Sequence, residues 1–222
     1  MDRALVDTAE IPGGGRLHLF RHGQDFEILF GEEQLMGSWA SGSEEALATL
    51  VCEQLGARAG RLLIGGLGMG FTLAAALAAA PASASIVVAE LVPKVVTWAG
   101  GPLAHIFGDS LSDPRVSLEI RDVHDVITEQ GAAYDAILLD VDNGPEGLIN
   151  LANERLYCNW GLRAAYAALR PGGILAIWSS YPDQEFFDRF GDAGFKVDEV
   201  RLETDGDQPQ AHHTIWLGTK PE

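Results

Sequence analysis

Residues 61–70, with the sequence RLLIGGLGMG, decide the fold of this chain. Residues 62–64 (LLI) form a short, wholly apolar run, which is typical of a central strand that is covered on both faces. Glycines follow this run, and the Ala- and Leu-rich residues 71–80 then predict a helix that ends at Pro81. Strand, glycine turn and helix are the opening unit of a nucleotide-binding α/β domain, because residues without a Cβ atom let the backbone turn sharply and let a ligand approach it.

The spacing of the glycines indicates which kind of nucleotide the turn would bind. Gly66, Gly68 and Gly70 form the pattern GxGxG. A dinucleotide-binding turn needs its third glycine one residue later, so this pattern favours an S-adenosylmethionine turn. A turn with a purely structural role is the alternative. We expect a side chain at Gly66 to occupy the space of the ligand, so that Gly66→Val folds but no longer binds a nucleoside.

An acidic residue stands where a nucleoside site needs one. Residues 86–89 (IVVA) form a second buried-strand run, and Glu90 ends it, about twenty residues after the glycines. A carboxylate at the end of the second strand can accept hydrogen bonds from both ribose hydroxyls. Alone, Glu90 is also compatible with a solvated strand end, but together with the glycine turn it predicts a nucleoside site.

Composition limits the partners of the chain. Its 222 residues suffice for one α/β domain with a small extra element. The formal net charge of −17 argues against nucleic acid as a partner, because phosphate binding depends on Lys and Arg. That charge suits a cationic substrate, although plain solubility explains it as well. Cys52 and Cys158 are isolated, so neither a disulfide framework nor a zinc cluster is indicated.

The sequence also predicts where the protein resides. Residues 1–10 lack the basic and apolar regions of a signal peptide. The longest apolar stretch, residues 73–80, is too short to span a bilayer. We therefore expect a soluble, cytoplasmic protein without a membrane partner.

Residues 1–42 predict a small N-terminal β-hairpin element. The runs 16–20 (RLHLF) and 26–30 (FEILF) have the composition of two strands joined by a turn. Residues 32–42 are expected to be irregular. Ser43 is expected to cap the helix that follows.

Residues 43–222 predict one α/β domain, because strands and helices alternate in a way that implies parallel strands with right-handed crossovers. Further strands are expected at residues 116–120, 136–139 and 174–178, with a long helix at 154–169. The runs 195–202 and 213–217 leave no room for a helix between them, so they should pair antiparallel. The predicted fold class is a Rossmann-like, doubly wound α/β fold, with a mostly parallel seven-stranded sheet and an antiparallel edge.

Further polar residues follow the predicted strands, and such sheets bind ligands at the carboxyl ends of their strands. Asp122 is expected either to meet an adenine amino group or to cap the next helix. Asp140 directly follows the apolar residues 136–139, where a charged side chain must face a polar cleft or lose its hydration. Asp140 is therefore the candidate catalytic residue. Asp142 and Asn143 are candidates for substrate binding, although their loop also fits a plain turn. The sequence indicates no metal-binding triad.

Several short motifs, taken in order, resemble the spermidine synthase family, a branch of the class I S-adenosylmethionine-dependent methyltransferase fold. Residues similar to the family's motifs are GEEQ at 31–34, the glycine turn at 65–70, Ala89-Glu90, DPRV at 113–116, Arg121-Asp122, Leu139-Asp140 and LRPGGIL at 169–175. The resemblance implies a homodimer in which Asp140 is catalytic. It also implies that the donor nucleoside is held by Gln34, Gly66, Gly68, Gly70, Glu90 and Asp122.

The sequence departs from the family on the side that would hold a polyamine. The family's glycine turn usually carries an Asp that contacts the aminopropyl group of decarboxylated S-adenosylmethionine, and Gly68 stands at that position. The family's Tyr-His-Glu trio is replaced by Ser43, Glu44 and Glu45. Only the final acid is kept, so Glu45 is expected to contact the substrate.

Three functions are compatible with these residues. The first is an S-adenosylmethionine-dependent methyltransferase acting on a small acceptor, for which an amine is one candidate. The second is an aminopropyltransferase that uses decarboxylated S-adenosylmethionine, and the third is a non-catalytic nucleoside-binding protein. The absence of an acid at Gly68 favours the first, because an ammonium in a closed site needs a paired anion. Glu45 or Asp142 could supply that anion, so the second function stays open, whereas Asp140 argues against the third.

Overall fold

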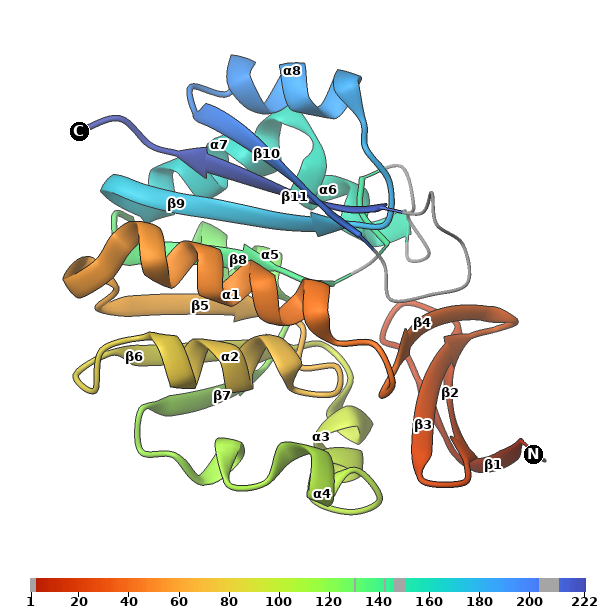
Figure 1. The fold of residues 1–222 in the computed structure, drawn as a ribbon. Coiled ribbons are helices and arrows are strands. Elements are labelled where there is room, and N and C mark those ends of the chain that lie inside the picture. The colour runs from red at the N-terminus through yellow and green to blue at the C-terminus, as the bar shows by residue number, and fades with distance from the viewer. Residues whose placement is uncertain (1–2, 130, 142, 146–150, 204–211) are drawn as a thin grey trace.

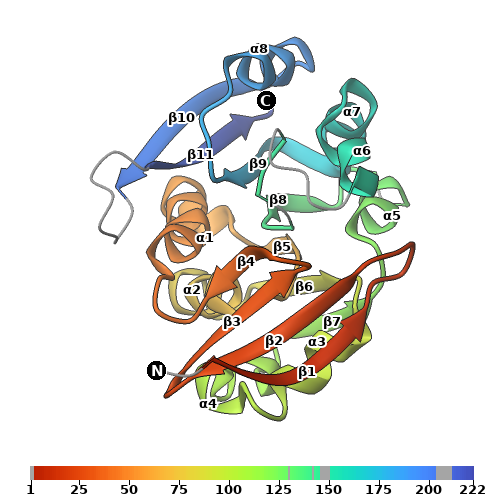
Figure 2. The same cartoon turned by 90° about the vertical axis from the view of Figure 1, so that its right-hand side faces the viewer.

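The computed structural model describes residues 3–129, 131–141, 143–145, 151–203 and 212–222. A seven-stranded sheet carries helices on both faces, and a separate N-terminal sheet stands at the end of it where the parallel strands finish (Figure 1). Figure 2 shows the N-terminal sheet lying across that end. Among the described residues, no helix combines the length and apolar character needed to cross a bilayer.

The large sheet has the strand order β10-β11-β9-β8-β5-β6-β7. Strands β5 to β9 pair parallel, and β11 runs antiparallel between β9 and β10. This arrangement confirms the predicted fold class. The strands are β5 Arg61–Gly65, β6 Ser85–Glu90, β7 Val116–Ile120, β8 Tyr134–Leu139, β9 Leu169–Ser179, β10 Lys196–Glu203 and β11 His212–Thr219.

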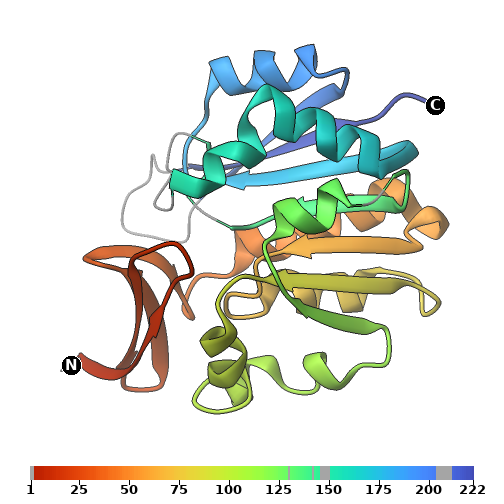
Figure 3. The ribbon, with the colours of Figure 1, turned by 180° about the vertical axis from the view of Figure 1, so that it is seen from behind.

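Helices cover both faces of this sheet, which explains the unbroken apolar run of β5. Leu62 and Ile64 pack into the core on the side of α1 and α2, whereas Leu63 packs into the core on the side of α5 to α8. Figure 3 shows the second face from behind. The helices are α1 Gly42–Leu55, α2 Phe71–Ala79, α3 Pro93–Ala99, α4 Ala104–Phe107, α5 Val123–Thr128, α6 Glu154–Tyr157, α7 Asn159–Ala168 and α8 Gln184–Asp192.

The N-terminal element is larger than the predicted hairpin. It is a four-stranded antiparallel sheet in the order β1-β2-β3-β4, in which β2 and β3 form the expected hairpin. The expectation that residues 32–42 are irregular is wrong for 33–37, because pairing with β3 and packing of Leu35 and Met36 make this weakly patterned segment a strand. The strands are β1 Ala4–Glu10, β2 Arg16–His22, β3 Asp25–Phe30 and β4 Glu33–Gly37.

Two helix predictions also need correction. The helix expected at 154–169 is broken at Cys158, whose extended backbone (φ −74°, ψ 167°) separates α6 from α7. A Cβ atom at Gly161 would lie 2.0 Å from the carbonyl oxygen of Arg155, so this turn needs a glycine. The residue before α1 is Ser41 rather than Ser43, and its hydroxyl makes no capping hydrogen bond.

Candidate functional site

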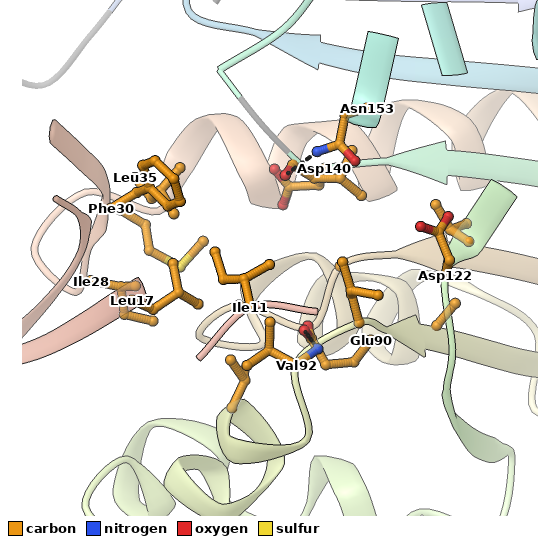
Figure 4. A pocket seen from close by; sticks show the side chains of 18 of the residues that line it. Ile11, Leu17, Ile28, Phe30, Leu35, Glu90, Val92, Asp122, Asp140 and Asn153 are labelled. Atoms are coloured by element: carbon orange, nitrogen blue, oxygen red, sulfur yellow. Dashed lines mark hydrogen bonds between the residues drawn. The ribbon is translucent and has the colours of Figure 1, made fainter. Parts of the chain in front are cut away.

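A cavity of about 140 Å³ lies between the N-terminal sheet and the carboxyl ends of the large sheet's parallel strands (Figure 4). Its side toward the N-terminal sheet is wholly apolar and is called the apolar wall below. The apolar wall consists of Ile11, Leu17, Ile28, Phe30, Leu35 and Met36. The remaining lining residues are Glu44, Gly66, Gly68, Ala89, Glu90, Leu91, Val92, Val95, Asp122, Val123, Asp140, Val141, Asn153 and Trp178.

The glycine turn brings backbone to the edge of the cavity. Gly66, Gly68 and Gly70 all have positive φ angles, of 90°, 50° and 84°. Gly66 and Gly68 line the cavity, whereas Gly70 lies outside the lining and packs against the ring of Phe107. A Cβ atom at Gly66 would lie 2.3 Å from the carbonyl oxygen of Asp140. It would meet the protein's own backbone before it met a ligand, which corrects the expectation that Gly66→Val folds normally.

Glu90 holds the glycine turn in place by a hydrogen bond to its backbone. Its side chain is buried, with 7% of the residue exposed. One carboxylate oxygen accepts a hydrogen bond from the backbone N–H of Leu67 at 2.8 Å, and the other accepts from Val92 at 2.7 Å. Burial raises the pKa of Glu90, and the backbone donors oppose that rise. Glu90 also lines the cavity, and its contact with a ribose diol remains a prediction.

Asp122 has the capping role that the sequence left open. Its Oδ1 accepts a hydrogen bond from the backbone N–H of His124 at 2.8 Å, which caps α5. Its Oδ2 is paired with Arg155. Asp122 also lines the cavity, at the end opposite the apolar wall (Figure 4). Its contact with an adenine group remains a prediction.

Asp140 and Glu44 form a pair of carboxylates in the cavity. Desolvation, together with the negative charge of Glu44, raises the pKa of Asp140 to about 7, although a hydrogen bond of 2.8 Å from Thr72 opposes the rise. Desolvation also raises the pKa of Glu44. Each of these two carboxylates disfavours the negative charge of the other. The pair therefore provides a base whose pKa suits proton transfer at neutral pH.

Two polar residues outside the cavity hold Glu44 in place. The hydroxyl of Ser43 donates a hydrogen bond of 2.6 Å to Glu44. The same hydroxyl lies 2.8 Å from Nδ1 of His213, on strand β11. The ring of His213 packs edge-on against Trp178, which lines the cavity. The position of Glu44 thus depends on residues 170 positions apart in the chain.

We expect Ser43→Ala to raise the pKa of Glu44 further, because the hydrogen bond from Ser43 stabilises the charged carboxylate. Carbon-13 NMR titration of the glutamate carboxyl groups measures this change. Ser41→Ala is the matched control, since the hydroxyl of Ser41 donates to Glu45, outside the cavity. A Glu44 pKa that stays the same in Ser43→Ala would contradict the assigned contact.

Other residues proposed from the sequence lie elsewhere. Glu45 is exposed and accepts a hydrogen bond from Ser41, so the structure places Glu44 in the cavity instead. Gln34 is exposed on β4, and its neighbours Leu35 and Met36 are the residues that line the cavity. Asn143 lies outside the lining, and Asp142 lies outside the described residues. Within the described ranges, no cluster of three or more His, Cys, Asp or Glu residues could hold a metal ion.

Comparisons with known proteins identify the fold. No protein-family model and no curated protein matches the sequence. Solved structures do match it. The spermidine synthase of Thermotoga maritima superposes with a TM-score of 0.77 at 16% identity, over 97% of this chain and 72% of that chain. A spermidine synthase in complex with the transition-state analogue AdoDATO gives the same values.

A probable spermidine synthase from Corynebacterium glutamicum matches with a TM-score of 0.66 at 15% identity, over 97% of this chain and 80% of that chain. The likeness in all three structures extends over both sheets, since it covers nearly the whole chain. At this level of identity it describes the fold. The chain therefore has a spermidine synthase-like fold, in which an N-terminal antiparallel sheet stands over the carboxyl ends of the parallel strands of a Rossmann-like domain.

Proposed function

We propose that this protein transfers an alkyl group from a nucleoside sulfonium donor to an amine. We further propose that the donor is decarboxylated S-adenosylmethionine, so that the reaction is aminopropyl transfer. The neighbouring spermidine synthase bound to AdoDATO supports this class of reaction. The sequence alone favours S-adenosylmethionine as the donor. The negative charge of the cavity supports the decarboxylated donor instead.

One observation carries the choice of donor. The described lining contains the carboxylates Glu44, Glu90, Asp122 and Asp140, and no Lys, Arg or His. S-adenosylmethionine brings a carboxylate of its own, which would lie in this negative field without a cationic side chain to pair with. The decarboxylated donor lacks that group and keeps its ammonium and sulfonium charges. An acidic cavity therefore favours it electrostatically.

The residues of the cavity fit such a donor. Glu90 would accept hydrogen bonds from the ribose hydroxyls, and Gly66 and Gly68 leave room for the nucleoside against the turn. Glu44 would pair with the aminopropyl ammonium, which supplies the anion that is absent at position 68. When bound, the sulfonium supplies an activated carbon and a neutral thioether leaving group.

Asp140 would act on the acceptor. An attacking amine must be neutral, and a carboxylate with a pKa of about 7 can take its proton near neutral pH. The transfer forms a C–N bond and breaks a C–S bond, whose electron pair stays on sulfur. The proton lost by the nitrogen goes to Asp140, so that atoms and charge balance.

Methyl transfer is the second candidate, because of the surroundings of Gly68. A Cβ atom at Gly68 would lie 2.7 Å from the terminal methyl carbon of Met36, so a thioether side chain fills the space beside the turn. No acid can stand there without displacing Met36. Such an apolar contact suits a small methyl group at least as well as an aminopropyl chain.

We expect the decarboxylated donor to bind at least about tenfold more tightly than S-adenosylmethionine, because only the latter places a carboxylate in the acidic cavity. Isothermal titration calorimetry on the full chain measures both affinities. Mass spectrometry of the nucleoside product then separates the reactions, since aminopropyl transfer yields methylthioadenosine and methyl transfer yields S-adenosylhomocysteine. Tighter binding of S-adenosylmethionine, or release of S-adenosylhomocysteine, would establish methyl transfer instead.

A matched pair of variants tests the role of Glu44. Glu44→Gln should remove most of the preference for the decarboxylated donor, because it removes a negative charge that repels the carboxylate of S-adenosylmethionine. Glu45→Gln changes the next residue of α1, whose side chain lies outside the cavity, and should leave the preference intact. Equal effects in the two variants would show that long-range charge, rather than contact with Glu44, sets the preference.

A further inference from the structure

The apolar wall is formed by one face of the N-terminal sheet together with Ile11, which directly follows β1. Leu17 on β2 stands directly opposite Phe30 on β3, and Ile28 on β3 stands opposite Met36 on β4. Side chains of directly paired residues project from the same face of a sheet. In Figure 4 Leu17, Ile28, Phe30 and Leu35 lie together on one side of Asp140, and Asp122 lies on the other. Asp140 therefore stands between the nucleoside end of the cavity and the apolar wall.

The acidic side chains described in the N-terminal sheet lie outside the cavity lining. Glu27 lies between Phe26 and Ile28 on β3, so it projects from the opposite face. It is buried, and its carboxylate pairs with Arg3 at 2.7 Å and with His22 at 2.9 Å. Among the described residues, no carboxylate of this sheet lines the cavity. A cation held against the apolar wall would thus find no anion among the described residues of this sheet.

The carboxylates on the other side of the cavity already have partners in the proposed reaction. Glu90 serves the nucleoside and holds Leu67 and Val92. Asp122 caps α5 and pairs with Arg155. Glu44 pairs with the ammonium of the donor, which leaves Asp140 for the reacting nitrogen. Among the described lining residues, no further acid remains for a second ammonium on the acceptor.

We propose that the acceptor is a primary amine with an apolar body, whose nitrogen meets Asp140 while its hydrocarbon part packs on the apolar wall. This inference rests on the proposed function and specifies its acceptor. A diamine or polyamine would have to bury a charged nitrogen against hydrocarbon, which is costly without a paired anion. A hydrocarbon chain gains binding free energy from each methylene group that it buries against the apolar wall.

A homologous series of amines tests this inference on the unmodified full chain. We expect the Kd of straight-chain primary monoamines to fall about fourfold for each added methylene until the wall is covered. Diamines of the same chain length should bind about 10- to 100-fold more weakly. Calorimetry measures the binding with the protein saturated with methylthioadenosine, and again without it. Initial rates with the preferred donor give kcat/KM for the same amines.

The outcomes of this experiment distinguish a failure of the inferred acceptor from a failure of the proposed function. If monoamine binding follows chain length but no transfer occurs, the acceptor site stands and the proposed function fails. If diamines bind more tightly than monoamines, the apolar acceptor is overturned, and transfer to the diamine then shows that the proposed function stands. The absence of binding by any amine, with or without methylthioadenosine, also overturns the apolar acceptor.

Leu35→Glu supplies an anion on the apolar wall and should shift the preference toward diamines by at least about tenfold. Leu35 is only partly buried on β4, which makes a charge there tolerable. Leu5→Glu is the matched control, because Leu5 is 56% exposed on β1 and lies outside the cavity lining. A preference that changes equally in both variants would show that net charge, rather than the wall, selects the acceptor. If Leu35→Glu does not fold, Met36→Gln is a second test, because it replaces part of the apolar wall with a polar side chain and should weaken the binding of monoamines more than that of diamines.

Discussion

Asp140→Asn is expected to lower kcat by about 10²- to 10⁴-fold, because the variant keeps the shape of the side chain and loses the base that accepts the amine proton. The Kd of the donor should stay within about tenfold, since the contacts proposed for the nucleoside are made by Glu90 rather than by Asp140. Steady-state kinetics and calorimetry on the same preparation measure the two effects. Full turnover in Asp140→Asn would remove Asp140 from the mechanism.

The stability of the same variant relative to that of the parent protein should increase as the pH rises. Folding raises the pKa of Asp140 from 3.8 to about 7, so the folded chain holds this proton more tightly than the unfolded chain does. That contribution to stability is complete below pH 3.8 and is lost as the pH rises through about 7. Asparagine stays neutral and avoids the loss. The melting temperature of the variant should therefore exceed that of the parent protein most clearly above neutral pH.

Asp135→Asn is the control for both effects. Asp140 directly follows β8, and Asp135 lies near the other end of that strand. Asp135 pairs with Arg170 and accepts hydrogen bonds from the backbone N–H groups of Gly60 and Arg61. Its loss should lower stability without reducing kcat. Equal losses of kcat in the two variants would indicate that any change in β8 disturbs the cavity, and that Asp140 has no special role.

The residues that the sequence could place are those at the carboxyl end of a strand, either as its last residue or directly after it. Glu90 and Asp140 come after runs buried on both faces, and in parallel sheets such positions meet at one edge. The glycine turn was readable because only glycine fits its positive φ angles. In these cases local pattern and topology determine where a side chain lies.

The rest of the site depends on contacts that no local pattern encodes. Glu44 and Glu45 are adjacent in α1, and successive helical residues project about 100° apart, so the orientation of α1 decides which of them enters the cavity. The apolar wall arises only where the N-terminal sheet meets the large sheet. Its strand β4 was missed because Leu35 and Met36 are adjacent and show no alternation. Ser43 and His213 form a side-chain contact although they lie 170 positions apart in the sequence.

Glu90→Ala is expected to weaken the binding of methylthioadenosine by about 2–3 kcal/mol, because it removes the charge-assisted hydrogen bonds to the ribose. That loss corresponds to a Kd about 30- to 150-fold higher. The structure adds a second cause, since the backbone N–H groups of Leu67 and Val92 lose their acceptor and the glycine turn loses its anchor. Calorimetry with methylthioadenosine measures the affinity.

Two further variants separate these causes. Glu90→Gln keeps one acceptor oxygen for Leu67 or Val92 but turns an amide donor toward the other N–H, so it should lose affinity while preserving more of the fold than Glu90→Ala. Glu119→Ala, on the adjacent strand β7 and outside the cavity lining, should leave the affinity unchanged. Thermal melting shows which variants remain folded. If a folded Glu90 variant binds methylthioadenosine as tightly as the parent protein does, Glu90 serves only to hold the turn, and the nucleoside must be placed elsewhere.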